Sequence, residues 1–126
     1  MTQTQLGFLL ISLMVPYLTW AEPASIATVA ERSEYRATAT HAEVMAICEQ
    51  LAETSSQIQL GSMGRTTEGR EQPLLIISKS GTRSPGPPCL FVMGNIHAGE
   101  VCGKEALLAL GREFAAGQHA GNDGGD

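Results

Sequence analysis

The sequence is poor in basic side chains and in aromatic rings. It has 8 lysine and arginine residues against 13 aspartate and glutamate residues in 126 positions, a formal net charge of −5, and 5% of it is aromatic. A protein that binds DNA or RNA through phosphates needs clustered positive charge, and the few basic residues here are scattered. The composition therefore excludes an electrostatic nucleic-acid binder and indicates a mildly acidic globular chain of one domain at most.

Long apolar runs are also scarce, and the one present lies at the amino terminus. Residues Leu6 to Trp20 carry no charge, but the run is shorter than the roughly 20 residues of a membrane-spanning helix, and Pro16 interrupts it. With small side chains at Thr19 and Ala21, residues 1–21 are predicted to be a signal peptide, although the first five residues lack Lys and Arg. We expect an exported protein, secreted or periplasmic. An uncleaved anchor or a misassigned start are the alternatives.

Cysteine is used sparingly and without a paired motif. The three cysteines are Cys48, Cys89 and Cys102, and no C-x-x-C pair is present to indicate a redox site or a zinc ribbon. An odd number leaves at least one thiol unpaired even in an oxidising compartment. We expect buried free thiols that act as small apolar side chains, with a Cys89–Cys102 disulfide as an open alternative.

Two segments have the periodicity of amphipathic helices. Thr40 and Glu43 form a T-x-x-E capping box, which predicts a helix from His41 to about Thr54. A second helix is predicted over Val101–Ala116. Its predicted apolar stripe consists of Leu107, Leu110 and Phe114. Both helices need a sheet or another helix to cover their apolar faces.

Three short apolar segments predict that sheet: Ile58–Leu60, Leu74–Ile77 and Leu90–Met93. The first two flank a turn at Glu68 and Gly69 and predict an antiparallel hairpin. The third is continuously apolar, which is typical of a central strand buried on both faces. The predicted fold class is α/β, with a partial mixed β-sheet flanked by helices.

The expected organisation has four parts. A signal peptide at 1–21 precedes an extended arm at 22–34, which lacks a sustained period. A single partial domain follows at 35–116. The remaining residues, 117–126, are rich in glycine and have no large apolar side chain, which predicts a disordered tail.

The segment that indicates a functional site is the loop Gly94–Glu100, GNIHAGE, between the third predicted strand and the second helix. His97 and Glu100 form an H-x-x-E pair at the place where open α/β sheets bind ligands. Imidazole nitrogen and carboxylate oxygen are both zinc ligands, so the pair is a candidate metal half-site. The plainer interpretation makes His97 a loop residue and Glu100 a carboxylate that favours the helix N-terminus.

The loop and its neighbours resemble the zinc carboxypeptidases, peptidase family M14. The resemblance runs in order through HAEVMAICEQLAE, IQLGSMG, GRTTEGRE, PLLIISK and GNIHAGEVCGKEALLAL, or about Tyr35 to Phe114. The last segment is similar to the family's first zinc motif and the helix that follows it. Several landmarks in the right order are more specific than one tetrapeptide. The resemblance implies the amino-terminal part of a zinc-carboxypeptidase-like (phosphorylase/hydrolase-like) fold, with His97 and Glu100 as Zn²⁺ ligands.

What the resemblance implies is a hydrolase that acts on the C-termini of peptides or proteins. Zinc polarises the scissile carbonyl and activates a water in such enzymes. A catalytic zinc site takes three protein ligands, and the family's second histidine and its glutamate general base are expected beyond this chain, so no catalytic residue is assigned within it. In the classical digestive members an arginine precedes the motif glutamate, whereas Gly99 stands here, a departure that bears on substrate recognition.

Other side chains offer little to complete such a site. His41 is expected to be a surface residue in the first turn of its helix, His119 lies in the predicted tail, and Cys102 is expected to be packed. We therefore expect a truncated metallocarboxypeptidase-type chain that is inactive alone. The alternatives are a noncatalytic secreted binding module of the same fold, or a small metalloprotein that uses His119 or a cysteine.

Overall fold

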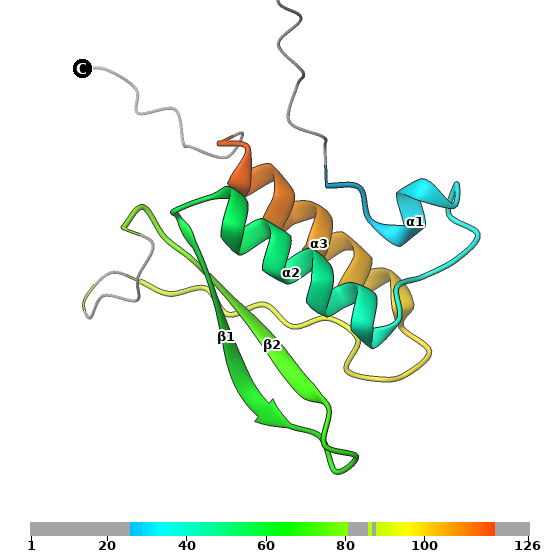
Figure 1. The fold of residues 1–126 in the computed structure, drawn as a ribbon. Coiled ribbons are helices and arrows are strands. Elements are labelled where there is room, and N and C mark those ends of the chain that lie inside the picture. The colour runs from blue at the N-terminus through cyan, green and yellow to red at the C-terminus, as the bar shows by residue number, and fades with distance from the viewer. Residues whose placement is uncertain (1–25, 81–85, 87, 118–126) are drawn as a thin grey trace, which may run out of the picture.

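The computed structural model describes residues 26–80, 86 and 88–117, and the chain forms an α/β fold (Figure 1). The elements in order are α1 (Val29–Arg32), α2 (His41–Thr54), β1 (Ile58–Arg65), β2 (Glu71–Ile77) and α3 (Val101–Ala115). The predicted fold class is confirmed. The predicted signal peptide and most of the predicted tail lie outside the described residues. No helix among those described is long and apolar enough to cross a membrane.

Helix α2 begins and ends where its capping signals place it. Thr40 has an extended backbone and accepts a hydrogen bond from the Glu43 amide, while the Glu43 carboxylate accepts one from the Thr40 amide at 2.8 Å. These reciprocal bonds satisfy two amides that a helix start leaves unpaired. The predicted range His41–Thr54 is confirmed.

Strands β1 and β2 form the predicted antiparallel hairpin. Ile58 is opposite Ile77 and Leu60 is opposite Leu75, so these apolar pairs share one face. Gly69 in the turn has a φ of 80°, a left-handed conformation that glycine adopts without a steric penalty. The turn arginines are exposed: Arg65 contacts Glu71 at 3.0 Å, and Arg70 pairs with Glu68.

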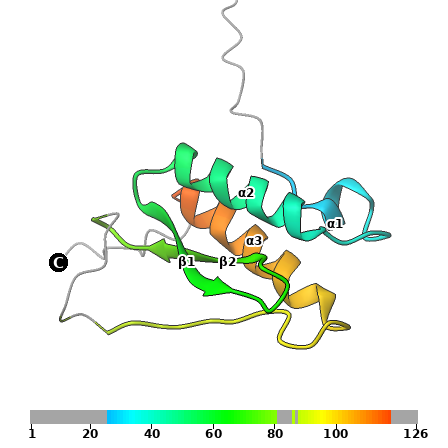
Figure 2. The same ribbon diagram turned by 60° about the horizontal axis from the view of Figure 1, so that its bottom comes forward.

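The core lies where α2 and α3 pack on the hairpin. Its buried members are Ile47, Cys48, Leu51, Ile58 and Leu108. Figure 2 shows α2 and α3 on the same side of the hairpin, so one face of the small sheet is covered by helices. The described residues therefore contain a single apolar cluster that joins all four longer elements.

The prediction of a third, central strand is wrong for this structure. Residues 88–95 form no strand, and the sheet of the described residues is a two-stranded antiparallel one rather than mixed. The side chains of Leu90–Met93 are exposed, between 51% and 87%. Burial on both faces needs partner strands at both edges and cover above and below, and the hairpin pairs only with itself. Figure 2 shows the segment running past the hairpin, on the side away from α2, to the start of α3.

The predicted extended arm also needs correction, because it contains α1. Thr28 and Glu31 form a second T-x-x-E capping box, with the Glu31 carboxylate 2.7 Å from the Thr28 amide. Arg112 of α3 binds the same carboxylate through two bonds of 2.6 and 2.8 Å and also donates to the Ile26 carbonyl at 3.1 Å. The arm is therefore attached to the domain rather than extending from it.

Helix α3 buries a face shifted by one position from the predicted stripe. Its buried residues are Glu105, Leu108 and Gly111, whereas Leu110 is 37% exposed. Because Glu105 is charged and Gly111 has no side chain, the periodicity of apolar residues does not reveal this buried face. Gly111 allows close packing there, because a Cβ at this position would lie 3.2 Å from the Leu51 Cδ1, a tight contact.

Two of the three cysteine predictions are wrong. Cys48 is a buried free thiol, as expected, and burial, helped by the charge of Glu49, raises its pKa to about 11, so it stays protonated. Cys89 and Cys102 are free but exposed. Cys89 belongs to the unpaired extended segment, and Cys102 lies on the open side of the first turn of α3.

The ion pair between Glu31 and Arg112 makes the free energy of unfolding depend on pH. The Arg112 guanidinium, with the Thr28 amide, lowers the pKa of Glu31 from its usual 4.5 to about 2. Because the folded pKa is the lower one, the pair stabilises the fold above pH 4.5, and this contribution is lost as the pH falls towards 2. We expect Glu31→Gln to lower the free energy of unfolding at pH 7 by about 1–2 kcal/mol and to leave little difference from wild type at pH 2. Urea unfolding at both pH values measures this.

A matched control is Glu34→Gln, which removes a carboxylate whose partner Arg36 is also exposed. We expect no measurable change from it, because both side chains are more than 70% exposed. An equal loss in the two variants would contradict the assignment of the acid dependence to the Glu31–Arg112 pair.

Candidate metal centre

The loop 94–100 connects the extended segment to α3 and carries both predicted zinc ligands. A turn closes within it, since the Glu100 amide donates to the His97 carbonyl at 3.0 Å. Asn95, two residues before His97, has a left-handed φ of 62°. A Cβ added at Gly99 would meet no atom within 4 Å, so packing does not require glycine at this position.

This turn brings His97 and Glu100 together. The His97 Nδ1 lies 2.9 Å from the Glu100 Oε1, and the two side chains are 77% and 59% exposed. Glu100 is the N-cap residue of α3, yet its side chain forms no capping bond. Glu100 therefore stands at the helix N-terminus, as in the plainer interpretation, but its carboxylate is directed to the imidazole rather than to a helix amide.

The pair fits two of the ligands of a zinc ion. It offers one nitrogen and one oxygen donor, both accessible and close together, which matches the ligand types of catalytic zinc sites. In the part of the chain that the structure describes, no group of three histidine, cysteine or acidic side chains is placed to hold a metal. A catalytic site takes three protein ligands, so the described residues offer two of the donors that such a site needs.

The other candidate ligands are not gathered at this loop. The Nε2 of His41 lies 2.7 Å from the carbonyl of Glu71, which ties the start of α2 to the start of β2. Cys102 is exposed and joins no ligand cluster among the described residues. His119 lies outside the described residues.

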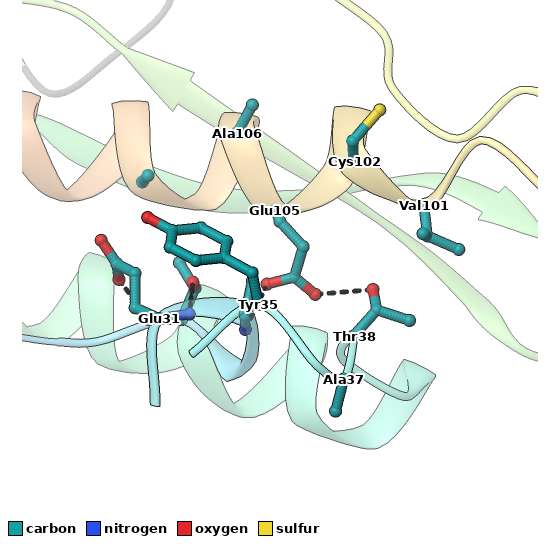
Figure 3. A pocket seen from close by; sticks show the side chains of 11 residues that line it. Glu31, Tyr35, Ala37, Thr38, Val101, Cys102, Glu105 and Ala106 are labelled. Atoms are coloured by element: carbon teal, nitrogen blue, oxygen red, sulfur yellow. Dashed lines mark hydrogen bonds between the residues drawn. The ribbon is translucent and has the colours of Figure 1, made fainter. Parts of the chain in front are cut away.

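A hollow of about 400 Å³ lies between the α1 region and α3. Figure 3 shows Tyr35 beside the Glu31 and Glu105 carboxylates, and Cys102 also lines the hollow. Both carboxylates already have partners: Arg112 binds Glu31, and the Glu105 oxygens accept bonds from Ala30, Thr38 and Ala39. This site therefore stabilises the fold rather than offering free catalytic groups.

Glu105 is a charged side chain whose role the sequence did not reveal. Burial alone would raise the pKa of its carboxyl, but the hydrogen bonds from Ala39, Thr38 and Ala30 outweigh burial and hold the pKa below its ordinary value. The available signal was its spacing of three and six positions from Leu108 and Gly111, which places all three on one helix face.

The turn before α3 thus presents a histidine and a carboxylate side by side, which are donor types found in zinc sites. A family model described as zinc carboxypeptidase matches residues 44–121, more than half of the chain. The chain belongs to the zinc carboxypeptidase family, as the resemblance of its motifs indicated. Zinc and peptide substrates are properties of this family. No solved structure matches the chain significantly.

Proposed function

We propose that His97 and Glu100 are two of the zinc ligands of a metallocarboxypeptidase-type peptidase, which removes residues from the C-termini of peptides or proteins. The observation that carries the proposal is their 2.9 Å contact in an exposed turn, within a chain of the zinc carboxypeptidase family. Exposure leaves both donors accessible to an ion and to a substrate. A carboxylate directed at the imidazole also orients the ring before any metal binds.

Bound zinc supplies polarisation of the substrate carbonyl and activation of a water in such sites. The chain's own part is to present the imidazole nitrogen and the carboxylate oxygen from one short turn. Gly99, between these ligands, leaves open space next to the pair, so no side chain from this position contacts a substrate. Among the described residues no third side chain joins His97 and Glu100 to hold a metal, and we propose that the chain by itself does not hydrolyse peptides.

We also propose that the protein is exported, secreted or periplasmic. The support is the uncharged apolar run from Leu6 to Trp20, which is followed by small side chains. Amino-terminal sequencing of the secreted protein tests it, with cleavage after Ala21 as the expected result.

A noncatalytic binding module of the same fold is the second candidate function. It is favoured by the exposure of Leu90–Met93, an extended apolar segment available to a partner strand. This candidate predicts cooperative unfolding without metal and no zinc binding at His97. The zinc titration below separates the two functions.

The test is a zinc titration of the whole chain, followed through the imidazole resonances in NMR spectra. We expect one zinc ion per chain at the His97 ring, with binding well below the roughly 10–16 kcal/mol of complete structural zinc sites. His97→Ala should abolish binding, while His41→Ala, which removes the other described imidazole, should retain it. Peptidase assays with zinc should give no turnover.

Three outcomes would contradict parts of this proposal. Unchanged binding in His97→Ala would remove the half-site. Loss of binding in His119→Ala would show that the tail supplies a ligand and that the small-metalloprotein alternative holds. Peptide turnover that disappears in His97→Ala would show that the chain is active by itself.

A further inference from the structure

The loop that carries the proposed zinc ligands touches α3 at a pair of glycines. A Cβ added to Gly94 would lie 2.7 Å from the carbonyl carbon of Gly103 and 2.9 Å from its oxygen. In the other direction, a Cβ on Gly103 would lie 3.3 Å from the Gly94 Cα and 3.4 Å from the Asn95 nitrogen. The backbones of loop and helix are therefore in direct contact, closer than any side chain permits at Gly94.

This contact holds the two ends of the segment from Gly94 to Gly103 next to each other. His97 and Glu100 lie between the two glycines in the sequence, so the contact brings together both ends of the segment that carries them. Inside the closed segment, the turn from His97 to Glu100 forms and Asn95 is held at a left-handed φ of 62°. The Asn95 Oδ1 is buried without a hydrogen-bond partner among the described residues, an unfavourable placement that the closed loop maintains.

Side-chain packing does not hold the two ligands in place, because His97 is 77% and Glu100 is 59% exposed. Their 2.9 Å separation follows from the turn that the Glu100 amide closes, and the contact between the glycines fixes the backbone on both sides of this turn. We propose that Gly94 and Gly103 are positioning residues, whose backbone contact sets the distance between the His97 imidazole and the Glu100 carboxylate. This inference rests on the proposed zinc site for its functional meaning, but the positioning itself needs no metal.

The test replaces Gly94 by alanine in the whole chain. Gly94 does not have a positive φ, so the added methyl conflicts only with its neighbours on α3 and moves the loop. Without metal, we expect the NOEs between the His97 ring and the Glu100 side chain to weaken or disappear. With zinc, we expect the apparent affinity measured at the His97 ring to fall roughly tenfold to a hundredfold, as for other residues that orient metal ligands.

Gly111→Ala is the matched control. It adds the same methyl group to the same helix against Leu51 and Leu75, at 3.2 and 3.4 Å, far along α3 from the loop. We expect a lower melting temperature with unchanged NOEs and zinc affinity. Gly94→Ala with wild-type NOEs and affinity, or Gly111→Ala with the same losses as Gly94→Ala, would overturn the proposal.

Gly103→Ala keeps the test decisive if Gly94→Ala does not fold. Alanine is the better helix former at this position in α3, and the tighter of its new contacts is 3.3 Å, so the variant should remain folded. We expect a smaller weakening of the NOEs and a smaller fall in zinc affinity than in Gly94→Ala. NOEs and affinity equal to those of wild type would overturn the proposal. If wild type binds no zinc, the proposed function fails, while the metal-free NOEs still decide whether the glycines position the pair.

Discussion

Replacing Glu105 by alanine is expected to lower the free energy of unfolding by about 3 kcal/mol at pH 7. The side chain is 7% exposed and accepts bonds from the Ala30 amide at 3.2 Å, the Thr38 hydroxyl at 2.8 Å and the Ala39 amide at 2.5 Å. Alanine leaves these donors without their partner, and an unsatisfied buried donor costs about 1–3 kcal/mol. Urea unfolding followed by circular dichroism measures the loss.

Two further variants show whether the Glu105 carboxylate itself accounts for the loss of stability. Glu105→Gln keeps the shape but exchanges an acceptor for an amide group that also donates, so we expect an intermediate loss of about 1–2 kcal/mol. Glu49→Ala removes an exposed glutamate from α2, and we expect a change within about 0.5 kcal/mol. A loss below about 1 kcal/mol in Glu105→Ala would show that water replaces the carboxylate at these donors.

Leu51→Ala is expected to have an effect at least as large, about 3–4 kcal/mol. Leu51 is completely buried, at 0% exposure, and lies at the centre of the cluster formed by α2, α3 and the hairpin. Truncation removes buried methyl groups and leaves a cavity beside Gly111, which has no side chain to fill it. Thermal and urea unfolding should agree on the loss.

Leu90→Ala is the control with the same change of atoms. Leu90 is 87% exposed, so we expect its truncation to change the free energy of unfolding by less than about 0.5 kcal/mol. If Leu90→Ala destabilised the chain as much as Leu51→Ala, the extended segment would have to be packed in solution. That result would contradict the exposed placement of residues 90–93.

Local signals in the sequence predicted the elements that local chemistry determines. The capping box at Thr40 and Glu43 gave the start of α2, and the turn at Gly69 gave the hairpin. The same T-x-x-E pattern at Thr28 and Glu31 predicts α1 equally well, and it was missed because the surrounding residues lack an apolar period. The His97–Glu100 pair was likewise predicted, since three positions within a turn bring two side chains together.

The features that depend on distant residues could not be predicted in this way. An apolar run such as Leu90–Met93 matches a buried strand, but whether it is buried depends on partners elsewhere in the fold. Glu105 is polar in the sequence and buried in the structure because its partners lie 66 to 75 positions away. The contact between Gly94 and Gly103 is a backbone approach, which hydrophobic periodicity does not register.

The ion pair between Glu31 and Arg112 has a consequence for the order of events during synthesis. Its partners are 81 positions apart, so at about 5–20 residues per second Glu31 is made roughly 4–16 seconds before Arg112. A helix of four residues is not stable alone in water, and α1 therefore cannot persist during that interval. The stretch that follows the amino-terminal apolar run thus stays accessible until α3 has been made, and only then docks on it.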